Sequence, residues 1–236
     1  MNLNDMIHSA IDKFVLAKTC YIGNGTGNLL RYKNRIYIVT CQHIADDILK
    51  VKDFEVILQG NIKLKKDKLG DVISTTSKMD ISLIEIFDSK LKIDCYRIDN
   101  FEFIEDFTKA DFSRTNFFLL GYPDSLSFKS DKGKNLLHMS YMTLLSKNKP
   151  STKDFLFVDY NRSVESNRII DTDLNYNLPH PGGMSGSFLF QVKVFEAKQN
   201  EIWTPPIVKI IGIQQSFDRI GNWIKCSNIK YLKELL

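Results

Sequence analysis

The sequence predicts an all-β fold of short strands arranged as barrels or sandwiches. Segments rich in β-branched and aromatic residues recur along the 236 residues, and Gly, Pro, Asn and Asp separate them. Helical spacing of apolar residues is confined to the two ends of the chain. Because helices do not alternate with strands, a parallel α/β architecture is excluded.

The first half of the chain begins with a helix and continues with strands. Residues 3–17 place Met6, Ala10, Phe14 and their apolar neighbours at helical spacing, which predicts one amphipathic helix. A polar turn at residues 31–35 joins the first two strands. The strands expected in this half are residues 20–30, 36–40, 54–58, 61–64, 72–74 and 81–87.

The second half repeats the strand pattern after a join. Residues 88–113 are mixed in composition and rich in aromatic side chains, so they are interpreted as the join between two halves. The terminal residues 228–236 have the pattern of a short helix. The strands expected in this half are residues 116–123, 138–145, 155–160, 188–195, 207–215 and 223–226.

The composition argues against several classes of function. The net charge is only +4, so no concentrated basic face marks a nucleic-acid binder. The four cysteines include no C-x-x-C pair, the usual signature of a zinc or redox site. No apolar run approaches the roughly 18 residues of a membrane span, and no secretory signal is visible. We therefore expect a cytoplasmic protein with reduced thiols.

A turn rich in glycine and serine is the first candidate for a catalytic site. Residues 180–187 read His-Pro-Gly-Gly-Met-Ser-Gly-Ser and precede an apolar strand. Glycine permits a tight turn there and close approach to the main chain. Ser185, between Gly183 and Gly186, would present an exposed hydroxyl beside two N–H groups. A nucleophilic serine with an oxyanion hole requires this local geometry.

A base and an acid stand upstream of this serine. His43 follows the strand at residues 36–40, and Asp80 opens the strand at residues 81–87. His138 lies inside a strand-like run, which favours a half-buried structural role, and His180 is too close in sequence to Ser185 for good geometry. His43 is therefore the best-placed base and Asp80 the best-placed orienting acid.

The order of these residues excludes the α/β-hydrolases. Those enzymes run Ser, acid, His and carry the elbow G-x-S-x-G. In this chain the serine comes last, and Ser187 stands where the final glycine of the elbow belongs.

Six segments in the right order resemble the trypsin-like (chymotrypsin-fold) serine peptidases in their compact bacterial form. They are similar to the G-[ST]-G strand, the histidine box, the aspartate strand, the G-[FY]-P turn, the nucleophile turn and the strand beside the substrate cleft. The matching residues are 25–30, 38–43, 79–84, 120–123, 181–187 and 211–215.

The resemblance implies two antiparallel six-stranded β-barrels with the active site between them. Residues 1–110 would hold the N-terminal helix and the first barrel, and residues 111–236 the second barrel and the C-terminal helix. It implies that His43 is the base, Asp80 the acid and Ser185 the nucleophile. Gly183 and Ser185 would supply the oxyanion-hole N–H groups.

Departures from the family pattern bear on activation and on packing. Met184 replaces the acid that precedes the serine in secreted relatives, so we expect that N-terminal cleavage does not create the active site. Cys41 and Gln42 replace two small residues before His43. Cys41 is expected to be a buried small hydrophobe rather than a nucleophile.

The resemblance also implies where a substrate binds. Pro179 stands at the expected base of the specificity pocket, and Gln215, Ser216 and Phe217 form its expected wall. Since none of these is acidic and Phe217 is large, we expect a shallow pocket for small or apolar side chains. Asp171 and Asp173 are the nearest acids in the sequence, and they would reach the pocket base only through a longer loop.

The sequence thus predicts a serine endopeptidase that acts on a peptide or protein through an acyl-enzyme. No cofactor, metal, nucleic acid or membrane partner is expected, and the oligomeric state is open. The alternative is a catalytically inactive domain on the same fold that binds peptides or a partner protein. The intact set of His43, Asp80 and Ser185 favours the enzyme.

Overall fold

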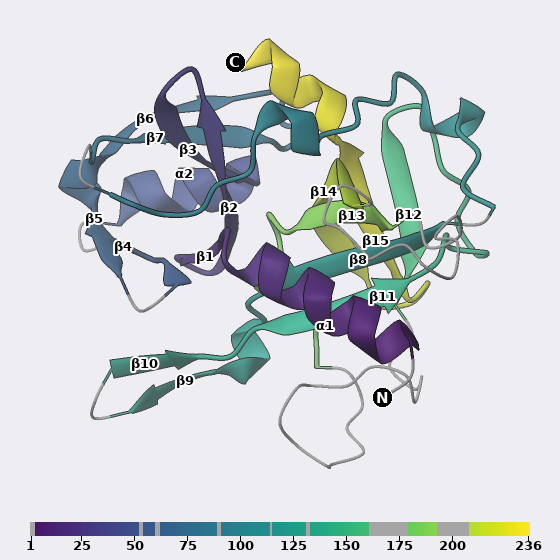
Figure 1. Cartoon of the computed structure of the whole chain (residues 1–236), viewed down its shortest axis with the longest axis horizontal. Helices are drawn as coiled ribbons and strands as arrows, with labels where there is room; N and C mark the ends of the chain where they lie inside the picture. Colours follow the sequence, from purple (N-terminus) through teal and green to yellow (C-terminus); the bar gives the residue numbers. More distant parts are fainter. Residues whose placement is uncertain are drawn as a thin grey trace.

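Two curled antiparallel sheets form the body of the protein (Figure 1). The computed structural model describes residues 3–51, 54–59, 62–88, 91–113, 115–130, 133–160, 179–192 and 208–236. Helix α1 (Leu3–Leu16) precedes the sheets, α2 (Gln42–Lys50) follows the third strand, and the 3-10 helix η7 (Ile229–Glu234) lies near the C-terminus. None of the helices in these described ranges has the length and apolar character needed to cross a membrane.

The first sheet has seven strands in the order β5-β4-β1-β2-β3-β7-β6. The hairpin between β2 and β3 turns at Lys33 and Asn34, which both have positive φ, as a two-residue turn between twisted strands requires. The strands are β1 (Thr19–Ile22), β2 (Gly25–Tyr32), β3 (Arg35–Thr40), β4 (Glu55–Ile57), β5 (Lys63–Lys65), β6 (Leu69–Ser74) and β7 (Ser82–Ile86).

The second sheet has six strands in the order β11-β8-β13-β14-β15-β12. The chain beyond β11 pairs with β12 through a bridge between Leu145 and Val158, which joins the two edges and closes the sheet. The strands are β8 (Asn116–Gly121), β11 (Met139–Thr143), β12 (Phe155–Asp159), β13 (Phe188–Val192), β14 (Val208–Asp218) and β15 (Trp223–Asn228).

A separate hairpin projects from the body beside the second sheet (Figure 1). It consists of β9 (Ser127–Ser130) and β10 (Gly133–Leu136). Short 3-10 turns complete the connections: η2 (Lys66–Lys68), η3 (Ile98–Asn100), η4 (Phe107–Lys109) and η5 (Asp124–Leu126).

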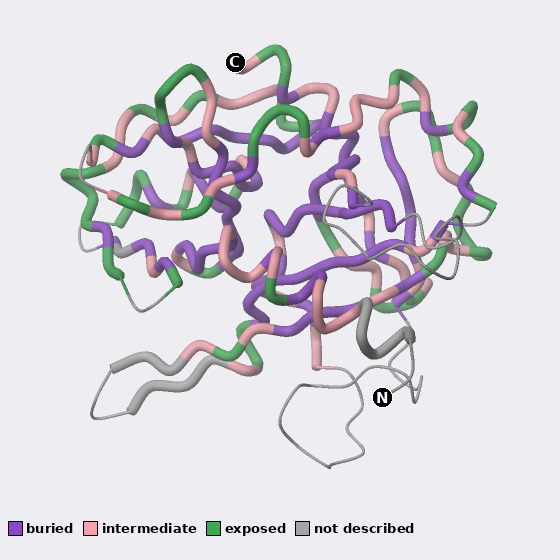
Figure 2. The backbone as a smooth tube through the Cα atoms, in the orientation of Figure 1, coloured by how far each residue is buried: buried purple, intermediate pink, exposed green. Residues whose placement is uncertain are grey.

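Three large apolar clusters lie inside the first sheet, inside the second sheet and between the sheets. A small fourth cluster holds Met79, Phe155 and Phe157. The buried traces in Figure 2 run through both sheets and through the region where they meet. The cluster between the sheets includes Ile11 of α1, Val39 of β3, Phe188 of β13 and Ile229 of η7. Helix α1 and η7 therefore help to hold one sheet against the other.

The structure confirms the predicted two-sheet, all-β class and corrects several details. The first sheet has seven strands rather than six, because a turn at Gly23, with φ of +60°, splits the expected strand at residues 20–30 into β1 and β2. Helix α2 is a third helix, where only a short turn after His43 was expected; Ile44, Ala45 and Ile48 give it a buried face. The hairpin of β9 and β10 was not predicted.

We expect Ile11→Ala to lower the free energy of unfolding by about 2–5 kcal/mol, the usual cost of truncating a buried isoleucine. Ile11 is fully buried between the sheets. Urea unfolding followed by fluorescence measures the change, and Lys13→Ala on the exposed side of α1 is the control. A loss below about 0.5 kcal/mol for Ile11→Ala would show that α1 is not part of the core.

Candidate active site

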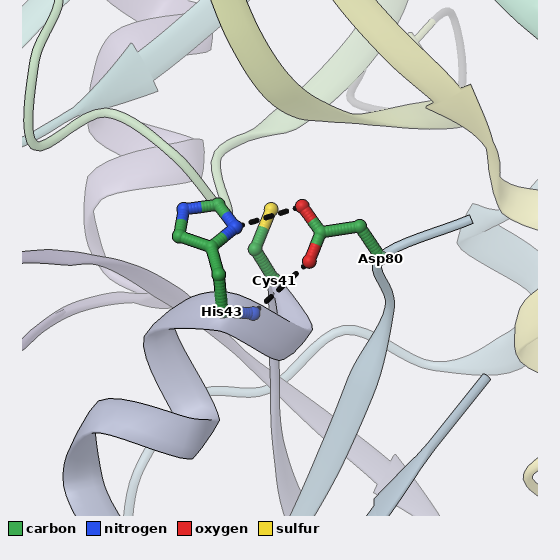
Figure 3. A group of neighbouring side chains, drawn as sticks. All are labelled: Cys41, His43 and Asp80. Atoms are coloured by element: carbon green, nitrogen blue, oxygen red, sulfur yellow. Dashed lines mark hydrogen bonds and ion pairs between the residues drawn. The ribbon is translucent and has the colours of Figure 1, made fainter. Parts of the chain in front are cut away.

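His43 and Asp80 form a hydrogen-bonded pair at the start of α2. His43 is the second residue of the helix, and Asp80 lies two residues before β7. The His43 Nδ1 atom lies 2.8 Å from Asp80 Oδ2, and the His43 backbone N–H donates to Asp80 Oδ1 at 3.0 Å (Figure 3). One carboxylate thus binds the ring and satisfies a free N–H of the first helical turn.

The environment of this pair favours a charged imidazole. The hydrogen bond to Asp80 raises the pKa of His43 above its ordinary value, and burial opposes this only in part. Asp80 is buried, while the His43 side chain is 48% exposed. Asp80 also has a φ of +55°, a left-handed conformation that Asp tolerates better than most residues. The backbone holds the carboxylate toward the helix.

Cys41 lies directly behind this pair. Its Sγ donates to the Gln214 carbonyl at 3.0 Å and lies with the His43 and Asp80 donor atoms in a group whose members are all within 4.8 Å of one another. The thiol is fully buried, as expected, and burial raises its pKa well above the usual value. Cys41 is therefore a protonated thiol in this state, not a competing nucleophile.

The turn that carries Ser185 requires its glycines. Gly183 and Gly186 have φ of +87° and +94°. A Cβ on Gly186 would lie 2.0 Å from the Thr26 carbonyl oxygen, and one on Gly183 would lie 2.6 Å from the Tyr122 carbonyl oxygen. Both positions therefore exclude a side chain for steric reasons.

A buried hydrogen-bond network ties this turn to the first sheet. Thr26 of β2 donates its N–H to the Ser185 carbonyl at 2.9 Å and its hydroxyl to the Gly183 carbonyl at 3.0 Å. The Asn28 side chain donates to the Gly186 carbonyl at 2.7 Å. We call these three bonds the Thr26–Asn28 clamp. No local pattern in the sequence indicates this clamp, although Thr26 lies in the matched G-[ST]-G segment.

Two backbone N–H groups remain open on the turn. Within the described chain, neither the Gly183 nor the Ser185 N–H donates a hydrogen bond. The neighbouring N–H groups are used: Met184 donates to Pro181, and Gly186 donates to Gln214. The pair of open donors is the feature that an oxyanion hole needs.

A cleft of about 470 Å³ brings the three predicted residues together. His43, Asp80 and Ser185 all line it. The Ser185 hydroxyl donates to the Gln215 carbonyl at 3.3 Å, and among the described residues no hydrogen bond joins it to His43. His180 and Lys225 also line the cleft. His180 was considered from the sequence only as a base and rejected, and Lys225 was not predicted.

The expected pocket wall lines the same cleft. Gln215, Ser216 and Phe217 are among its lining residues, whereas Pro179 is not. The Phe217 ring packs edge-on against Tyr160 and His180, with ring centroids 5.1 and 5.5 Å away. The aromatic side chains of Tyr160 and His180 therefore pack against Phe217, in the expected wall of the specificity pocket.

The expected pocket base involves Pro179 and, through a longer loop, Asp171 and Asp173. Pro179 accepts a hydrogen bond from the Tyr160 hydroxyl through its carbonyl oxygen. Asp171 and Asp173 lie outside the described residues.

Comparisons with known proteins give structural matches only. No family model matches the chain, and no curated protein matches its sequence. A structure of Glu endopeptidase is 11% identical, with 93% of this chain and 90% of that chain covered and a TM-score of 0.52. The serine protease domain of the Sesbania mosaic virus polyprotein is 13% identical, with coverage of 93% and 92% and a TM-score of 0.50.

A structure of Deg5 matches over an even larger share of the chain. It is 13% identical, with 99% of this chain and 94% of that chain covered and a TM-score of 0.54. Identities this low establish the architecture and not the activity. The chain therefore has the two-barrel fold of the chymotrypsin-like serine peptidases.

Proposed function

We propose that this chain is a serine endopeptidase in which Ser185 is the nucleophile, His43 the general base and Asp80 the orienting acid. The observation that carries the proposal is the shared cleft, onto which the hydrogen-bonded His43–Asp80 pair and Ser185 all open. Acyl transfer needs a nucleophile, a base and a group that fixes the base.

Acylation begins when the Ser185 side chain rotates away from the Gln215 carbonyl toward His43. His43 Nε2 takes the hydroxyl proton while Oγ bonds to the substrate carbonyl carbon. The imidazolium then gives that proton to the leaving amine as the C–N bond breaks. Water repeats the two steps on the acyl ester, which releases the acid and restores Ser185.

The remaining groups stabilise charge during these steps. Asp80 keeps the N–H on Nδ1, so that Nε2 is free to accept the proton, and it stabilises the imidazolium that forms. The open N–H groups of Gly183 and Ser185 bind the oxyanion. The Thr26–Asn28 clamp holds the carbonyls of the same turn, which restrains the backbone that carries these two N–H groups.

The substrate backbone is proposed to pair with residues 215–217. β13 pairs with β14 as far as Ile213, and the Ser185 turn binds the backbone of Gln214. Within the described chain, no strand pairs with this edge of β14 from Gln215 onward, so it can accept an extended peptide. Gln215, Ser216 and Phe217 are proposed to bind the peptide, with Pro179 behind them. Because Phe217 and its aromatic partners occupy space beside the cleft, the specificity pocket is proposed to be shallow and to accept small or apolar substrate side chains.

We further propose that residues 1–110 and 111–236 are the two structural units and that the protein acts in the cytoplasm on peptides or proteins. Both statements rest on the sequence.

A non-catalytic module that binds peptides on this fold is the second candidate. The hydrogen bond from Ser185 to Gln215 favours it, because the hydroxyl is turned away from the base. This candidate predicts peptide binding without turnover and without a reactive serine.

We expect Ser185→Ala to abolish covalent labelling by a fluorophosphonate probe and to lower peptide hydrolysis by roughly three or more orders of magnitude. The melting temperature should hardly change, because the Ser185 hydroxyl makes only one long hydrogen bond among the described residues. Ser187→Ala is the matched control: its buried hydroxyl has no hydrogen-bond partner among the described residues, so its loss should leave labelling intact. Equal labelling of wild type and Ser185→Ala would refute the assignment.

The rate of fluorophosphonate labelling should rise with pH as His43 loses its proton. Since the bond to Asp80 raises the pKa of His43, the midpoint should lie above the ordinary imidazole value of about 6.5. Asp80→Asn removes that cause and should move the midpoint to lower pH while slowing the reaction. A midpoint that Asp80→Asn leaves in place would contradict the pairing.

A peptide-library cleavage profile should show small or apolar residues before the cleaved bond and few Lys or Arg. A cation would meet His180 and Lys225 in the cleft, and among the described lining residues only Asp80 is acidic. Phe217→Ala should extend the profile to larger apolar residues. Strong preference for Lys or Arg in the wild type would overturn this account of the pocket.

A further inference from the structure

Three side chains of the kind that bind transition metals meet beside the cleft. The Cys41 thiol, a ring nitrogen of His43 and a carboxylate oxygen of Asp80 all lie within 4.8 Å of one another. Figure 3 shows the sulfur next to the line that joins the imidazole to the carboxylate. The three come from nearby segments: Cys41 directly precedes α2, His43 lies in its first turn, and Asp80 lies two residues before β7.

This donor set suits Zn²⁺, which binds thiolate at about 2.3 Å, imidazole at about 2.0–2.1 Å and carboxylate at about 2.0–2.2 Å. Tetrahedral bonds of these lengths separate the ligand atoms by roughly 3–4 Å. The His43 Nδ1 and Asp80 Oδ2 atoms, now 2.8 Å apart, have to separate by less than about 1 Å. The fourth position would hold water.

The site is accessible from one side. Cys41 and Asp80 are buried, but the His43 side chain is 48% exposed at the cleft, so rotation of the ring admits an ion. On binding, Cys41 gives up the hydrogen bond to Gln214 and releases one proton to solvent, and the His43 N–H moves from Nδ1 to Nε2. Cys41 has no part in the proposed reaction.

We propose that Cys41, His43 and Asp80 form an inhibitory Zn²⁺ site. The ion uses the same Nδ1 and carboxylate oxygen through which His43 and Asp80 bind each other. A chain with the ion bound lacks both the orienting bond and an imidazole that can accept a proton from Ser185. Inhibition rests on the proposed function, whereas binding does not.

Cd²⁺ titration of the Ser185→Ala protein tests binding without any activity. Cd²⁺ resembles Zn²⁺ in its ligand preferences and gives a thiolate charge-transfer absorption in the ultraviolet. We expect one Cd²⁺ per chain, displaced by Zn²⁺, and at least tenfold weaker binding when Cys41→Ala is added. Cys41→Ser, which keeps the side-chain size, should behave in the same way and guards against misfolding.

Cys95→Ala is the matched control, because Cys95 is the one described cysteine that is not fully buried. Its removal should leave the Cd²⁺ signal unchanged. A signal that survives the loss of Cys41, or that disappears with Cys95, would overturn the site.

Inhibition is then measured on the wild type by fluorophosphonate labelling in the presence of Zn²⁺. Cys41→Ala and Cys41→Ser should need at least tenfold more Zn²⁺ for half inhibition. Equal sensitivity of these variants and the wild type would refute inhibition through Cys41. A chain that binds Cd²⁺ through Cys41 and never reacts with the probe would contradict the proposed function and leave the metal site standing.

Discussion

The hydrogen bonds that Thr26 makes across the two sheets are the constraint on which the site depends. The Ser185 turn belongs to the second sheet, yet its carbonyls are bound by a strand of the first. These bonds are buried, so their loss would leave several carbonyls without partners, at a cost of about 1–3 kcal/mol each. Gly186 has no room for a Cβ because the Thr26 carbonyl lies against it. The glycines of the turn are therefore a consequence of the contact between the sheets as much as of the turn itself.

The same contact places the histidine opposite the serine. β2 and β3 are neighbours in the first sheet, and Thr40 at the end of β3 donates its hydroxyl to the Thr26 carbonyl at 2.8 Å. The chain then turns directly into α2, where Asp80 binds both the backbone and the ring of His43. The strand that binds the Ser185 turn and the helix that carries His43 are thus one connected unit. A shift between the sheets would disturb both together.

The sequence predicts the parts of this arrangement that short segments encode. Strand-like segments, the glycines around Ser185 and the order of His43, Asp80 and Ser185 are local features, and they indicate the fold and the candidate site. The Thr26–Asn28 clamp and the places of His180 and Lys225 in the cleft depend on contacts between residues far apart in the chain, which no local pattern reports. The split of the first strand at Gly23 was missed because both pieces have the same strand-like composition.

In the proposed reaction, the Ser185 hydroxyl, the His43–Asp80 pair and the open N–H groups act together on one substrate carbonyl group in one cleft. A crystal structure of the protein after reaction with a fluorophosphonate tests it most directly. We expect phosphorus bonded to Ser185 Oγ, with one phosphonyl oxygen about 3 Å from the N–H groups of Gly183 and Ser185 and His43 Nε2 facing the adduct. An adduct on another residue, or a phosphonyl oxygen turned to solvent away from both N–H groups, would contradict the account.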